Sequence, residues 1–87
     1  MIKVATIIPS ANRTGDEDFN NHWLTIKPFQ SNIIGLTLII KKLNGIEKRF
    51  PMSDTTIPFQ ENVSDYNFYW FEYQSSDKEY KISVALY

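Results

Sequence analysis

Polar and apolar residues alternate along several short stretches of the chain, and turn-forming residues separate these stretches. In the clearest stretch, at the end of the sequence, one set of alternate positions is apolar: Tyr80, Ile82, Val84 and Leu86. Alternation with a period of two is typical of a strand with one buried face. No window of eleven or more residues keeps a helical period without a Pro or Gly. We therefore predict an all-β fold.

The predicted strands are short, which favours a small antiparallel sandwich of two sheets. They span residues 2–8, 23–26, 33–43, 46–50, 66–74 and 79–87. The segment 51–65 contains Pro51 and Pro58, which predicts an edge strand or an irregular connection. The polar segment 9–21 predicts a mobile loop. Together these elements predict one domain, residues 1–87, with six or seven strands, and a partly open barrel as the alternative.

The Asn44-Gly45 dipeptide predicts a two-residue hairpin turn. Such a turn pairs residues whose numbers add to 89, so that Lys41 faces Lys48. Opposed lysines repel one another unless an anion lies between them. The cations around this turn are therefore a candidate anion contact: Lys41, Lys42, Lys48 and Arg49. Solvated lysines at a hairpin tip also discourage edge-to-edge aggregation, which is the simpler interpretation.

The last two predicted strands indicate a second hairpin, around Ser75–Lys78. An even-numbered loop pairs residues whose numbers add to 153, which places Glu72 opposite Lys81. A three-residue loop would instead put Glu72 on the buried face, so we favour the even-numbered loop. In this register the alternate aromatic residues join the core: Tyr69, Phe71 and Tyr73.

The same register gathers large rings on the other face of this hairpin, because Tyr87 then lies opposite Tyr66. Rings spaced two residues apart form an apolar patch of a kind that often marks an interaction site. The candidate binding residues are Tyr66, Phe68, Trp70 and Tyr87. Alternatively, one of the two irregular segments or a second sheet covers this face.

Composition excludes several classes of function. The chain has 87 residues, no cysteine and a formal net charge of -1 at pH 7. Without cysteine there is no disulfide, no thiol nucleophile and no cysteine-based metal site. The small net charge argues against nucleic-acid binding, which depends on clustered Lys and Arg.

Segment lengths and residue usage give expectations about location and origin. The longest apolar stretch, Ile33–Ile40, is far shorter than the roughly 20 residues of a membrane-spanning helix, and we expect no membrane contact. The apolar stretch after Lys3 is too short for a signal peptide, so we expect a cytoplasmic protein. Ile, Asn and Lys supply 25 of the 87 residues, a bias typical of AT-rich coding DNA. This bias suggests a low-GC bacterium or its phages, and thus host cytoplasm or a virion.

Candidate catalytic and metal-ligating residues are few. His22 is the only histidine, and its place beside Trp23 at a strand start predicts a surface or loop position. Asp16, Asp18 and Asn20 match the first ligand positions of a calcium loop, but the pattern then fails because no glycine follows at the sharp turn. We predict no catalytic residue, no metal site and no cofactor.

These observations together predict a non-catalytic protein-binding or assembly module that binds a protein partner or forms a homo-oligomer. A virion component, a subunit of an assembly or a phage-borne inhibitor of a host factor would fit. Interfaces are rich in Tyr, Trp and Phe. The first alternative is a carbohydrate-binding module, in which the rings stack on sugars. The second is single-stranded nucleic-acid binding, in which bases stack on the rings and lysines contact phosphates.

Overall fold

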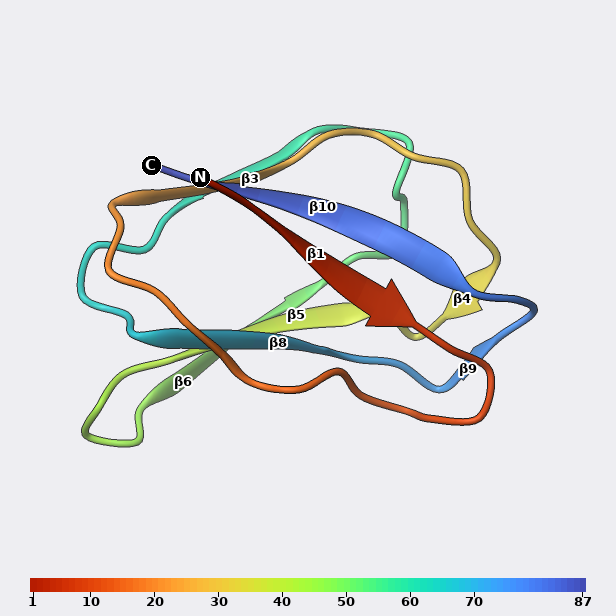
Figure 1. Ribbon diagram of the computed structural model, residues 1–87, viewed down its shortest axis with the longest axis horizontal. Helices are drawn as coiled ribbons and strands as arrows, with labels where there is room; N and C mark the ends of the chain where they lie inside the picture. The colour runs from red at the N-terminus through yellow and green to blue at the C-terminus, as the bar shows by residue number, and fades with distance from the viewer.

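Two four-stranded antiparallel sheets face each other across the core, and the chain contains no helix (Figure 1). The computed structural model describes residues 1–87. Sheet A has the order β1 (Ile2–Ile7), β10 (Tyr80–Leu86), β3 (Trp23–Ile26) and β7 (Phe59–Asn62). Sheet B has the order β2 (Glu17–Asp18), β8 (Phe68–Glu72), β5 (Thr37–Lys41) and β6 (Glu47–Pro51). A third, two-stranded sheet pairs β4 (Ile33–Ile34) with β9 (Ser75–Ser76).

The predicted all-β sandwich is therefore confirmed. Ten strands are present, and three of them, β2, β4 and β9, have only two residues each. The sheets do not close into a barrel, because each keeps two separate edge strands. No helix exists that could span a membrane.

The core lies between the inner faces of sheets A and B, and it contains no buried polar or charged residue. Alternation along the strands decides which side chains enter it. The inward residues of β10 are buried, as predicted: Ile82, Val84 and Leu86. Tyr80 is partly buried and packs against the core. The predicted core positions on and just after β8 are also confirmed: Tyr69, Phe71 and Tyr73.

The predicted hairpin between β8 and β10 is wrong. The strand β8 belongs to sheet B, where it pairs with β5 and β2, whereas β10 belongs to sheet A, where it pairs with β1 and β3. Glu72 consequently lies opposite Thr37 and not opposite Lys81. Both strands bury one face in the same core, so their alternation is the same whether they pair side by side or stack face to face. Between them β9 pairs with β4, and the chain crosses from one sheet to the other.

The Asn44-Gly45 hairpin exists, but its register differs by one residue from the prediction. Lys41 faces Glu47, not Lys48. The amide of Lys42 donates to Ile46 and the amide of Gly45 donates to Lys42, which leaves a three-residue loop. Gly45 has a φ of 92°, as the glycine bulge that closes such a loop requires. Opposed lysines, the basis of the predicted anion contact, are therefore absent.

Both irregular segments take positions at sheet edges. Within 51–65, β7 is an edge strand of sheet A, as predicted. The segment 9–21 runs along β8 and includes β2; the amide of Thr14 donates to Phe71 at 2.9 Å, and its hydroxyl accepts from the Phe71 amide at 3.0 Å. In Figure 1 this segment, in red to orange, runs beside β8 and then crosses its ribbon. Its mobility stays a prediction.

Gly35 separates β4 from β5 within the predicted strand 33–43. It has a φ of 71°, and a Cβ built on it would lie 3.3 Å from the Cβ of Gln74. This close approach allows the amide of Gln74 to donate to Ile34 at 2.7 Å.

Candidate protein-binding surface

The four predicted binding residues do not form one surface. Tyr66 lies in the turn before β8, where its ring packs against the core. Phe68 and Trp70 alternate with the buried Tyr69 and so project from the outer face of sheet B. Tyr87 follows β10 in sheet A, where it exchanges backbone hydrogen bonds with Trp23 and not with Tyr66.

Trp70 is covered although it faces away from the core. It is only 5% exposed, and the guanidinium of Arg13 lies 5.0 Å from the centre of its ring. Ile39 lies opposite Trp70 in the ladder with β5 and is fully buried outside the core. Arg13 comes from the segment 9–21 and is fixed by an ion pair with Asp16. As an alternative, we expected one of the two irregular segments or a second sheet to cover the face with Phe68 and Trp70. The segment 9–21 does cover the ring of Trp70.

A second cation completes this cover. Glu72 accepts a hydrogen bond from Trp70 Nε1 at 2.9 Å and pairs with Arg49, with 3.1 Å between Oε1 and Nη1. The hydrogen bond from Trp70, followed by that from Arg49, holds the pKa of Glu72 below its usual value. The charged groups next to Trp70 are thus paired with one another, and this face offers little free apolar area.

The predicted cationic cluster is dispersed. Lys42 lies 5.2 Å from the ring centre of Tyr66, and Lys48 lies 5.4 Å from that of Phe50. Lys41 faces Glu47 across the hairpin, while Arg49 pairs with Glu72 and Glu47. No two of these cations converge on a shared anion site. Carbohydrate binding and nucleic-acid binding stay predictions, and the buried ring of Trp70 offers neither ligand a stacking surface on this face.

The outer face of sheet A exposes apolar side chains, with the polar side chains of Lys81, Ser83 and Thr25 on the same face. Pairing between β1, β10 and β3 places on this face Ile2, Val4 and Trp23, which are 69%, 54% and 38% exposed. Tyr87, 57% exposed, lies beside Trp23. Between these rings and β1 lies a shallow hollow of about 180 Å³ lined in part by Ile2 and Ala85. Of the exposed large apolar side chains on strands, Ile2, Val4 and Trp23 lie here, and Ile34 lies on β4.

One border of this face is the free edge of β1. Met1 and Leu86 exchange both backbone hydrogen bonds, at 2.8 and 3.0 Å, which fixes the alternation in the β1–β10 ladder. The odd-numbered residues of β1 therefore form the hydrogen-bonded pairs with β10. The N–H and C=O groups of the even-numbered residues Ile2, Val4 and Thr6 point away from β10. At the next such position, Ile8, the hydroxyl of Tyr73 both donates to the carbonyl and accepts from the amide.

The other sheet edges carry features that block further pairing. In sheet B, β2 has two acidic residues, and β6 has three consecutive charged residues, from Glu47 to Arg49, and ends at Pro51. In sheet A, β7 follows Pro58 and contains Glu61. On β1, Lys3 is the one charged residue, and its ammonium is turned inward to Glu17 at 3.3 Å. Its outward residues are uncharged.

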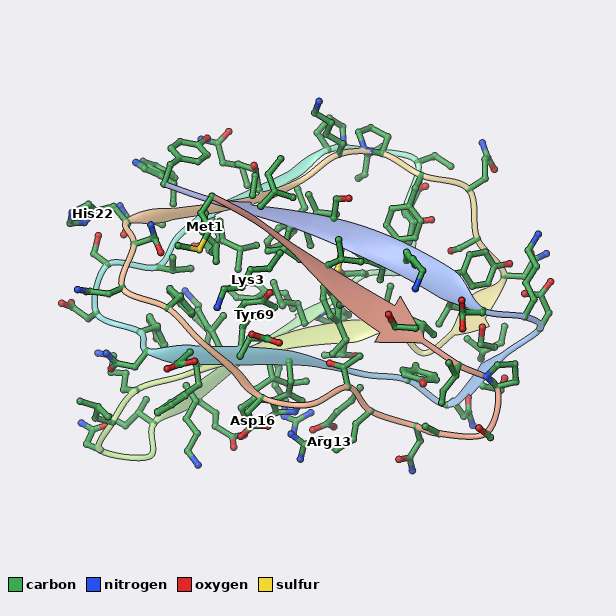
Figure 2. The ribbon with its side chains drawn as sticks, viewed as in Figure 1. Met1, Lys3, Arg13, Asp16, His22 and Tyr69 are labelled. Carbon is green, nitrogen blue, oxygen red and sulfur yellow. The ribbon has the colours of Figure 1, made fainter.

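A cleft of about 260 Å³ runs beside this free edge, between β1 and the segment 9–21. Val4 and Thr6 line one side, and Gly15 and Glu17 line the other. Tyr69 lies in the cleft wall; it is 1% exposed, and its hydroxyl is buried without a hydrogen-bond partner. Burial, with a smaller contribution from the charge of Glu17, raises the pKa of Tyr69 to about 12, so the hydroxyl stays protonated at neutral pH. Figure 2 shows Lys3 and Tyr69 between the ribbons of β1 and β8.

Sequence reasoning missed β1 as a surface strand. A signal was present: Ile2, Val4 and Thr6 alternate with Lys3, Ala5 and Ile7, and neither set is free of apolar residues. Such a strand has apolar side chains on both faces, so one apolar set must stay outside the core. The sequence did not reveal which set, because Lys3 would ordinarily be assigned to the solvent face.

His22 is exposed just before β3, as predicted, and its Nδ1 lies 3.2 Å from the hydroxyl of Ser64. No group of three or more His, Asp or Glu side chains is arranged to hold a metal ion. No protein-family model, curated protein or solved structure matches the chain.

Proposed function

We propose that this protein is a non-catalytic assembly module that binds a second copy of itself through β1 and the apolar side chains beside it. The observation that carries this proposal is the free edge of β1, where Ile2 and Val4 are exposed and no charged side chain points outward. An exposed edge with unpaired N–H and C=O groups is a template for another strand.

The strand β1 suits pairing with its own kind. Its outward side chains are uncharged, so two copies meet without like-charge repulsion. The same pairing at β6, centred on Lys48, would set two lysines opposite each other, and Pro51 at the end of that strand has no N–H to donate. Association also covers the apolar side chains of Ile2 and Val4, which favours the paired state.

Light scattering combined with size exclusion over a concentration series tests this function. We expect the wild-type chain to shift from monomer to dimer as its concentration rises. Val4→Lys should weaken the dimer at least about tenfold, because two copies then bring lysines together. A chain that stays monomeric at every concentration would refute the proposal.

Gln60→Lys is the matched control. The amide of Val63 donates to His22 at 2.7 Å, and by alternation the amide of Gln60 points to the free edge of β7. Gln60 is also exposed, so this substitution adds the same charge at the opposite edge of the same sheet. We expect its dissociation constant to equal that of the wild type.

A further inference from the structure

The geometry points to one register for this association: β1 pairs antiparallel with the partner's β1 about a two-fold axis at Val4, and each copy's Lys3 enters the other copy's cleft beside Tyr69. This inference rests on the proposed function and specifies its binding mode. It joins the two A sheets into one continuous sheet across the axis.

Backbone alternation selects this register. The unpaired backbone groups belong to Ile2, Val4 and Thr6, which lie symmetrically about Val4. In an antiparallel ladder, residues whose groups point to the same edge must face one another. Placing the axis at Val4 pairs it with the partner's Val4, and pairs Ile2 with the partner's Thr6. Every unpaired group then finds a partner, whereas moving the axis by one residue to Ala5 would set Ile2 opposite Ile8, whose backbone groups already bond the hydroxyl of Tyr73.

Charge placement also favours the axis at Val4. An axis at Lys3 would set two lysines directly opposite each other. With the axis at Val4, Lys3 instead faces the partner's Ala5, and Ala5 faces the partner's Lys3. Ala5 points inward and borders the cleft, so the partner's ammonium is directed toward the wall that carries Glu17 and Tyr69.

The cleft has the groups that such an ammonium requires. Glu17 supplies a carboxylate, which Lys3 of the same chain contacts at 3.3 Å while also donating to the carbonyl of Asp18 at 2.7 Å. The Tyr69 hydroxyl is buried and has no partner within the chain, and its oxygen can accept a hydrogen bond. Around the axis two lysines then lie among two glutamates, which balances the charge.

Single-cysteine crosslinking tests this register, because the chain has no cysteine of its own. In antiparallel pairs the Cα atoms of facing residues lie about 4.5–5.5 Å apart, within the range that a disulfide spans. Val4→Cys should therefore form a covalent dimer under mild oxidation. Ile2→Cys and Thr6→Cys should each crosslink poorly alone, but an equal mixture of the two should give the mixed dimer. We expect these products to form at least about tenfold faster than for Gln60→Cys on the opposite edge.

The outcomes separate this inference from the proposed function. If light scattering shows a dimer but Val4→Cys crosslinks no faster than Gln60→Cys, the register is wrong while self-association stands. If Ile2→Cys and Thr6→Cys each crosslink efficiently alone, the axis does not lie at Val4. A chain that stays monomeric refutes both. Lys3→Met adds a check on the cleft: it should weaken association, and unchanged association would remove the partner's Lys3 from the interface.

Discussion

The outer faces of the two sheets differ in what covers them. On sheet B, Trp70 and Ile39 lie beneath Arg13 and beside the Glu72–Arg49 pair, and both are almost fully buried. On sheet A, Ile2 and Val4 are more than half exposed and no other segment lies over them. Each face carries two large rings, Phe68 and Trp70 on sheet B and Trp23 and Tyr87 on sheet A, yet only the face of sheet A leaves its apolar side chains open.

This difference shows that ring content alone does not identify a binding surface. A large ring on an outer face can be sealed by a few long side chains, because the aliphatic stem and planar head of arginine cover apolar area well. Aliphatic residues on an edge strand have no such neighbours on one side. Coverage depends on contacts between residues distant in sequence, such as Arg13 and Trp70.

The largest expected effect compares the two tryptophans. Trp70→Ala removes a buried ring and should lower the free energy of unfolding by about 3–5 kcal/mol. Trp23→Ala removes a ring that is 38% exposed and should cost clearly less. Urea unfolding followed by circular dichroism measures both. Equal losses would mean that the two faces are not covered differently.

Tyr69→Phe should act in opposite directions on folding and association. Removing a buried hydroxyl without a partner should stabilise the monomer by about 1 kcal/mol. The same change deletes an acceptor for the partner's Lys3 and should weaken the dimer. Thermal unfolding at low concentration and light scattering at high concentration measure the two effects. Loss of monomer stability would show that this hydroxyl already has a partner within the fold.

Alkaline pH tests the same hydroxyl. The pKa of Tyr69 is raised in the folded state to about 12, whereas it lies near 10 in the unfolded chain. The free energy of unfolding therefore does not depend on this proton below about pH 10. Stability should fall as pH rises above about 10, because the unfolded chain loses that proton more readily. Tyr80, whose pKa is raised by its hydrogen bond to Asp77, adds a loss of the same sign. The Tyr69→Phe variant should show the smaller loss.

The smallest effect concerns the polar cover of sheet B at acid pH. The pKa of Glu72 is lowered in the folded state, so its contribution is present above the ordinary value near 4.3 and is lost as pH falls through the folded value. Wild-type stability should therefore decrease below about pH 4 more than that of Glu72→Gln. Parallel pH curves for the two proteins would show that this carboxylate does not hold Arg49 and Trp70.

The sequence predicts much of the fold, and the limits have physical causes. Alternation located the long strands and identified Ile82, Val84 and Phe71 as core residues, because the period-two pattern reports which face is buried. It could not pair β8 with β5, since strands that stack across a core and strands that lie side by side share the same pattern. The error of one residue at Asn44-Gly45 has a similar origin, because two-residue and three-residue loops both use that dipeptide.

The candidate surface was less predictable than the fold. Alternation along the last strand placed Tyr87 on the outer face, where it is exposed, but the residue beside it is Trp23 and not Tyr66. Lys3 concealed the role of β1, because a lysine that faces the opposite sheet is unusual. Its inward direction depends on Glu17, which lies on the edge of sheet B and whose position no local pattern reveals.

Residue-resolved amide hydrogen exchange at low and high protein concentration tests the central claim most directly. It compares the free edge of β1 with that of β7 in the same sheet. If β1 is the association surface, the amides of Val4 and Thr6 should become protected as concentration rises, while that of Gln60 exchanges rapidly throughout. Rapid exchange at Val4 and Thr6 at every concentration would contradict the account.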